Sequence, residues 1–364
     1  MKKRIWALCL AGCLLLTGCE GIFDSSYVYT EPHKEENTQT DTGAIQAADY
    51  DSLCKALANL AENGTESGIV YVPRYDQSKI SADISKAVRQ TLQDNPIAAY
   101  AVEDIQCELG TSGGQSAIAV NITYVHDRSE IRKIRRVTDL EMAKAVITEE
   151  LDNCAAGVVL YLENFEAVDL AQMVEDYADS SPQTVMETPQ VTVNIYPETG
   201  DSRVVELKFT YQNSRDSLRS MQEQVSPVFA SAVLYVSGDA AEREKFSQLY
   251  SFLMERYEYK VETSITPAFS LLRHGVGDSK AFAVVYGAMC RRAGLKCYVV
   301  TGTRWGGPWF WNIVEDDGQY YHVDLLRCSE EGYFQERTDA EMEDYVWDYS
   351  AYTGKTEETV PSES

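Results

Sequence analysis

The 364-residue sequence predicts an α+β protein in which two similar small modules are followed by a third domain of different pattern. Short runs of alternating apolar and polar residues, typical of strands, are interspersed with runs of helical periodicity. Similar segments recur at an interval of 87 to 89 residues in the first part of the chain. Further on, residues 275–324 predict a buried helix that leads into an antiparallel hairpin.

The chain opens with the features of an export signal. Residues 2–4 are basic, residues 5–16 are apolar, and residues 16–19 read Leu-Thr-Gly-Cys. The apolar run is too short for a membrane-spanning helix, which indicates a cleaved signal peptide over residues 1–18. The segment before Cys19 resembles a bacterial lipobox. The resemblance implies that Cys19 is lipidated and that it holds the chain on the membrane at its extracytoplasmic face. The alternative is a plain signal peptide with a chance cysteine.

Composition agrees with an exported protein. Removing residues 1–18 takes away three basic residues and no acidic ones, so the net charge falls from -25 to -28. Such a charge repels nucleic acid, and we expect no nucleic-acid partner. Six of the nine cysteines lie beyond Cys19, and their spacing matches neither a metal site nor a small disulfide scaffold. We therefore expect mostly free, buried thiols, no metal and no cofactor.

Two polar segments flank the expected folded part. Residues 19–48 lack apolar periodicity and are expected to form a flexible tether, and residues 354–364 form a polar tail.

The repeat predicts two tandem α+β modules, at residues 49–137 and 138–236. The segment 68–71 matches 157–160, and 121–124 matches 208–211. The near-constant offset is too long for a solenoid and indicates a duplicated module. Neither copy contains a catalytic cluster, so we expect a binding or spacing role. The first copy is expected to contain helices at 53–61, 80–92 and 131–137, and strands at 69–72, 98–108 and 117–125.

The third domain, residues 237–353, begins with an amphipathic helix at 240–257. A second helix at 279–293 ends where Gly294 follows it, and β-branched and aromatic runs then predict strands. An Asp-Gly pair at 317–318 separates two of these runs and is a strong hairpin signal. The expected strands are 295–301, 309–315 and 319–324.

This third pattern resembles the transglutaminase-like superfamily, which has a papain-like core. The segments Ala-Gly-Leu at 293–295, Trp-Asn-Ile-Val at 311–314 and Tyr-His-Val-Asp at 321–324 carry the resemblance. Aligned on them, the catalytic cysteine position falls on Ser279 and the catalytic histidine position on Trp309. The aspartate of the triad is retained as Asp324.

These replacements predict a catalytically inactive domain. A hydroxyl such as that of Ser279 is a weak nucleophile unless a base takes its proton. The indole of Trp309 cannot be that base, because its nitrogen only donates hydrogen bonds. Asp324, with no imidazole to orient, then needs another donor, such as the Trp309 indole or a backbone amide.

Three functions remain open for the third domain. It could bind an envelope protein, peptide or glycan through Trp305, Trp309 and His322 beside the former active-site groove. It could be a serine hydrolase or acyltransferase that uses Ser279 with His322 or His274 as the base. It could also be a structural spacer in the envelope, in which Trp309 simply plugs the groove.

Overall fold

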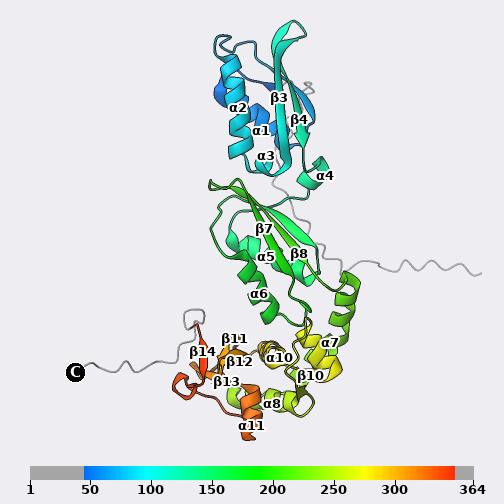
Figure 1. Ribbon diagram of the computed structural model, residues 1–364, viewed down its shortest axis with the longest axis vertical. Helices are drawn as coiled ribbons and strands as arrows, with labels where there is room; N and C mark the ends of the chain where they lie inside the picture. The colour runs from blue at the N-terminus through cyan, green and yellow to red at the C-terminus, as the bar shows by residue number, and fades with distance from the viewer. Residues whose placement is uncertain (1–44, 349–364) are drawn as a thin grey trace, which may run out of the picture. The chain divides into compact units, whose positions relative to one another are not determined.

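The computed structural model describes residues 45–348 (Figure 1). The predicted signal peptide, Cys19, residues 19–44 of the predicted tether and the tail at 354–364 lie outside the described residues. Among the helices described, none is both long and apolar enough to cross a membrane.

The first module is a four-stranded sheet with the strand order β1-β2-β4-β3, against which two helices pack. Strand β4 buries every second residue, Ile118, Val120 and Ile122, so one face of the sheet is apolar. Asp49 caps the first helix in a capping box with Ser52. The elements are β1 (Ile45–Gln46), α1 (Tyr50–Glu62), β2 (Ser67–Tyr71), α2 (Ile80–Asp94), α3 (Pro96–Ala101), β3 (Val102–Ser112) and β4 (Gln115–Tyr124).

The second module has the same arrangement, with the strand order β5-β6-β8-β7. The outer pair is parallel and the other pairs are antiparallel in both sheets. Gly68 pairs with Val120 in the first sheet, and Gly157 pairs with Lys208 in the second. The elements are α4 (Arg128–Ile131), β5 (Arg135–Val137), α5 (Leu140–Asp152), β6 (Gly157–Leu162), α6 (Leu170–Ser180), β7 (Gln190–Tyr196) and β8 (Arg203–Thr210).

Two of the elements expected in the modules, and the expected end of the tether, are wrong in part. The start of the strand expected at 98–108 is helical, because Asn95 caps a short helix whose first residue is Pro96. The helix expected at 131–137 is instead the end of α4 followed by β5, which pairs with β6. Similarly, β1 lies within the expected tether and pairs with β2. In both sheets the short outer strand is therefore contributed by residues that precede the expected module.

The third domain is built around α10 (Ser279–Arg292), in which every residue from Ser279 through Cys290 is buried apart from Lys280. Apolar side chains of α7 (Arg215–Tyr235) and α8 (Glu242–Met254) pack in the same core. Gly294 ends the helix with a φ of +81°, as the sequence predicted. Between α8 and α10 lie β9 (Glu258–Tyr259), α9 (Pro267–Phe269), a π-helical turn (Ser270–His274) and β10 (Val276–Gly277).

An antiparallel sheet, with the strand order β13-β12-β11-β14, covers α10. Asn312 on β12 faces the helix and donates to the carbonyl of Ala283 at 2.9 Å. Asp317 and Gly318 both have positive φ in the turn between β12 and β13, which confirms the predicted hairpin. The elements are β11 (Cys297–Arg304), β12 (Gly307–Asp316), β13 (Gln319–Val323), α11 (Leu325–Glu331), a 3₁₀ turn (Asp339–Glu341) and β14 (Tyr345–Trp347).

All six cysteines of the described residues are free thiols, as predicted. Four of them are buried and two, Cys54 and Cys107, are half-buried. The folded part of the chain is thus held together without a disulfide among these residues.

Candidate functional site

Ser279 is the first residue of α10, and Asp278 caps this helix by accepting the backbone N–H of Ala281 at 2.9 Å. Its side chain is buried, and its Oγ accepts the backbone N–H of Phe310 on β12 at 3.3 Å. Within residues 45–348, no histidine nitrogen is hydrogen-bonded to this hydroxyl. The serine therefore has the place of a nucleophile but lacks the base that would activate it.

Trp309, near the start of β12, occupies the position at which the sequence implied a histidine. Its indole Nε1 donates to Oδ2 of Asp324 at 2.8 Å. The ring also packs against the α10 core and against a smaller aromatic core on the other side of the sheet. Both kinds of donor predicted for Asp324 are present, the Trp309 indole and backbone amides. Because the indole nitrogen carries a proton and no available lone pair, it cannot accept one from Ser279.

Asp324 is almost fully buried and has its other partners within the fold. Its Oδ1 accepts the backbone N–H groups of Leu326 and Arg327 at 3.0 and 3.2 Å, so it caps α11. Tyr345 Oη donates to Oδ2 at 2.7 Å. Burial and the charge of Asp324 raise the pKa of Tyr345 well above its usual range, so the phenol remains a donor. The carboxylate accepts both backbone and side-chain donors and serves as a structural junction.

The charge of Asp324 is balanced by a buried arginine. Arg304 Nη1 lies 3.7 Å from Oδ2 of Asp324, and Nη2 lies 2.9 Å from Oε2 of Glu330. The guanidinium also stacks on the ring of Trp305, with 3.9 Å between its carbon and the ring centroid. Neither Nε nor Nη1 makes a hydrogen bond within residues 45–348. Asp324 is thus neutralised by a cation rather than by an imidazolium.

Residues 230–334 match the family model of the transglutaminase-like superfamily. This segment is a transglutaminase-like domain. The predicted papain-like arrangement of a buried helix under an antiparallel sheet is therefore confirmed as a transglutaminase-like fold.

Three solved structures are similar to parts of the chain. A TGase has 10% identity, with 60% of this chain and 63% of that chain covered and a TM-score of 0.26. A predicted protease from Parabacteroides distasonis has 10% identity, coverage of 60% and 35%, and a TM-score of 0.23. A predicted cysteine protease from Cytophaga hutchinsonii has 14% identity, coverage of 43% and 70%, and a TM-score of 0.25. The match covers less than two thirds of the length of the TGase and of the Parabacteroides distasonis protein. No curated protein matches the sequence.

His322 does not line an open groove of the transglutaminase-like domain, contrary to the expectation from sequence. It is 1% exposed, its Nδ1 accepts the indole N–H of Trp311 at 2.9 Å, and its Nε2 lies 2.9 Å from Asp339 Oδ1. Because Nδ1 accepts, the proton of the neutral ring is on Nε2 and is donated to Asp339. Burial lowers the pKa of His322, an effect that Asp339 opposes. Both nitrogens are therefore engaged in structural bonds.

The other histidine considered from sequence, His274, lies at the end of the π-helical turn. It is exposed, and its ring meets that of Phe269 edge to face, with 5.3 Å between the centroids. Neither this histidine nor His322 is therefore hydrogen-bonded to Ser279, and the described residues contain no assembled serine–histidine pair.

Trp305 lies at the tip of the hairpin formed by β11 and β12 and is 69% exposed. Its φ is +52°, and Gly306 follows with +79°. A bulky residue at positive φ is uncommon and costs roughly 1–3 kcal/mol. The surface beside Trp305 also includes Trp309, which is half-buried, and Tyr259. The ring centroids of Trp309 and Tyr259 are 5.9 Å apart. These three rings are hereafter called the aromatic surface.

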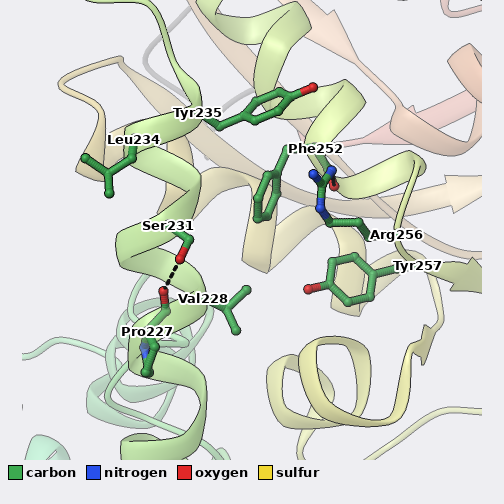
Figure 2. A pocket seen from close by; sticks show the side chains of 8 residues that line it. All are labelled: Pro227, Val228, Ser231, Leu234, Tyr235, Phe252, Arg256 and Tyr257. Carbon is green, nitrogen blue, oxygen red and sulfur yellow. Dashed lines mark hydrogen bonds between the residues drawn. The ribbon is translucent and has the colours of Figure 1, made fainter.

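A separate groove of about 570 Å³ lies between α7 and the end of α8 (Figure 2). Arg256 lies over the ring of Phe252, with 4.4 Å to its centroid, and Ser231 Oγ donates to the carbonyl of Pro227 at 2.8 Å. None of the lining side chains is a cysteine, a histidine or a carboxylate, and the titratable groups of the groove are the phenols of Tyr235 and Tyr257 and the guanidinium of Arg256. The lining residues are Pro227, Val228, Ser231, Leu234, Tyr235, Phe252, Arg256 and Tyr257.

The sequence analysis missed Arg304 and Tyr345 as partners of Asp324. A signal for the arginine was present, because strand alternation places residue 304 on the same face as Val300, which is fully buried. An inward-pointing arginine needs a buried carboxylate. Tyr345 gave no such signal, since β14 pairs with β11 from the far end of the domain.

Proposed function

We propose that the transglutaminase-like domain is catalytically inactive and serves as a binding module for an envelope protein, peptide or glycan. The observation that carries the proposal is the 2.8 Å hydrogen bond from Trp309 to Asp324 at the position of the catalytic base. Loss of one core member of such a catalytic unit costs about 10⁶ in kcat in a well-studied serine protease. In this domain a hydroxyl replaces the thiol and an indole replaces the imidazole.

The aromatic surface supports binding over a purely structural spacer. Trp305 is held exposed at the first position of the two-residue β11–β12 turn, where φ must be positive and where asparagine or glycine is the usual residue. Flat, exposed aromatic rings stack well on sugars and on the side chains of peptides. The serine-hydrolase alternative has less support, because Ser279 has no base and both nitrogens of His322 are occupied.

Acyl transfer by the wild-type protein is therefore expected to be undetectable in assays of amine incorporation and of peptide hydrolysis. Ser279→Cys alone should also be inactive, because a thiol still lacks a base. Combining Ser279→Cys with Trp309→His places a thiol and an imidazole at the family positions, with Asp324 available to orient the ring, and should give a trace of activity.

Ser279→Ala is the matched control for these assays. If the wild type turns over substrate and Ser279→Ala does not, the domain is an enzyme and the proposal of an inactive binding module is wrong. Activity that is equal in both proteins comes from a contaminant and leaves the predicted inactivity standing.

We further propose that the protein is a lipoprotein, anchored to the cell membrane through Cys19 on the extracytoplasmic face. The basic, apolar and Leu-Thr-Gly-Cys segments at the start of the chain support this. Cys19→Ala is expected to release the protein from the membrane or to leave it unprocessed, as measured by membrane fractionation and by mass. Cys54→Ala is the control, because Cys54 is half-buried in α1 of the folded part. Unchanged mature mass and unchanged membrane retention in Cys19→Ala would contradict the anchoring.

We also propose that the two modules arose by duplication. Their identical strand order supports this origin, as do the places of Ser67 and Gly157, which begin β2 and β6 and pair with the matched residues Asn121 and Lys208. Their role in the proposed function is to hold the transglutaminase-like domain away from the membrane.

A further inference from the structure

Two exposed carboxylates flank the aromatic surface. The backbone N–H of Trp305 donates to the carbonyl of Asp344 at 3.1 Å, so this exposed aspartate lies beside the turn that carries the ring. Glu330, whose side chain is 56% exposed, lies 2.9 Å from the guanidinium of Arg304. Both acidic residues come from segments that lie after the hairpin in the chain.

The ring of Tyr259, which is 40% exposed, is also close to carboxylates. Partial burial and then the charges of Asp278 and Glu330 raise the pKa of its phenol, and Arg304 opposes this effect. A phenol with a raised pKa keeps its proton at neutral pH and carries no charge of its own. The charges that act on this ring are therefore mainly negative.

Arg304 does not cancel the negative charge. Its guanidinium is buried and is shared between two carboxylates, those of Asp324 and Glu330. Lys260, which follows Tyr259, is an exposed cation in this neighbourhood. With Asp278 and Asp344 included, the carboxylates outnumber the two cations. The net charge of the whole chain, -25, adds to the attraction for a positively charged partner.

Rings of this surface already contact one guanidinium inside the protein. The central guanidinium carbon of Arg304 lies 3.9 Å from the ring centroid of Trp305 and 5.4 Å from that of Trp309. Arginine stacks well on aromatic rings, because its planar and weakly hydrated cation is attracted to the negative face of the ring. This contact holds Trp305 in place while 69% of the residue stays exposed. The exposed part of the ring remains available to a ligand.

We propose that the aromatic surface binds a basic segment of an envelope peptide or protein, with an arginine side chain of the ligand stacked on Trp305 and its charge facing Glu330 and Asp344. This inference rests on the proposed binding function and names the class of its ligand. The charges of the surface decide between the ligand classes. A neutral glycan offers no charge to these carboxylates, and an acidic peptide would be repelled by them.

The test is isothermal calorimetry of the purified full chain with a capped peptide of four arginines. A matched peptide of citrulline keeps the shape of the side chain but not its charge, and should bind at least about 5-fold more weakly. Raising sodium chloride from about 0.01 M to about 0.1 M should also weaken binding of the arginine peptide. The reason is that the Debye length shortens from about 30 Å to about 10 Å.

Trp305→Asn tests the ring without endangering the fold, because asparagine is favoured at the first position of this two-residue turn. The variant should bind the arginine peptide at least about 5-fold more weakly. Its control is Tyr298→Ala, which removes a ring that is 40% exposed near the opposite end of β11. This control should bind like the wild type.

Glu330→Gln tests the charge and should weaken binding of the arginine peptide as well. The matched control is Glu244→Gln, an equal change of charge at an exposed position in the first turn of α8. That turn lies at the far end of β12, since the backbone N–H of Asp317 donates to Glu242 at 3.4 Å. Glu244→Gln should bind like the wild type.

The inference is overturned if the wild type does not bind the arginine peptide. It is also overturned if Trp305→Asn binds this peptide as tightly as Tyr298→Ala does, since such binding would be general attraction to an acidic protein. A chitin tetrasaccharide serves as the neutral glycan probe. If the tetrasaccharide binds through Trp305 and the arginine peptide does not, the proposed binding function stands and this inference alone fails. If neither probe binds, the binding role of the aromatic surface fails with it.

Discussion

Replacing Asp324 with alanine is expected to lower the free energy of unfolding of the transglutaminase-like domain by about 3–5 kcal/mol. The change leaves the Trp309 indole and the Tyr345 hydroxyl without their acceptor and leaves Arg304 without its nearby counter-charge. It also removes the cap of α11. Urea denaturation followed by tryptophan fluorescence measures the loss, because all the tryptophans among the described residues lie in this domain.

Two variants separate this structural role from a catalytic one. Ser279→Ala removes a single hydrogen bond at 3.3 Å and should cost only about 1 kcal/mol. Asp324→Asn keeps an acceptor oxygen but loses the charge, so its cost should lie between those of the two alanine variants. If Asp324→Ala were no more destabilising than Ser279→Ala, the carboxylate would not be a structural junction.

The second large effect is expected at Glu336. Burial and Asp316 raise the pKa of this carboxyl from its ordinary value of 4.5 to about 7 in the folded protein. The folded state therefore binds a proton more tightly than the unfolded state does. The contribution of Glu336 to the free energy of unfolding is largest below about pH 4.5. It falls as the pH rises from about 4.5 to about 7 and stays low above about pH 7. The loss across that interval is about 3 kcal/mol.

Glu336→Gln should remove that loss. The variant is expected to be more stable than the wild type at pH 8, by up to about 3 kcal/mol, and close to it near pH 4.5. The free energy of unfolding is measured by urea denaturation at a series of pH values. The control is Glu343→Gln, which makes the same change of charge at an exposed position. Parallel pH profiles for the wild type and Glu336→Gln would show that this carboxyl ionises normally in the fold.

The elements of the third domain that could be predicted from sequence are those with strong local signals. The apolar periodicity from residue 279 and the glycine at 294 located α10 to within one residue, and the Asp-Gly pair located the β12–β13 turn. Trp309 could be recognised as the partner of Asp324 because both stand at positions of a known constellation. In each case the determining residues are close together in the chain or belong to one motif.

The features that escaped prediction depend on pairings between distant segments. The outer strands β1 and β5 are only two and three residues long, and their strand character comes from pairing with β2 and β6. The short helix α3 is the exception, since its Asn-Pro start was a readable signal. The Asp324 junction likewise gathers residues whose proximity only the folded chain creates.

The Asp324 junction bears on how this domain can evolve. A return to acyl transfer from the proposed inactive state needs a thiol at 279 and an imidazole at 309. Trp309→His alone removes an indole that packs in two cores and a 2.8 Å bond, while Ser279→Cys alone gains no base. Tyr345 would also still donate to the carboxylate that the imidazole needs. Each single step thus lowers stability or brings no activity, so both substitutions would have to be present together before acyl transfer is gained.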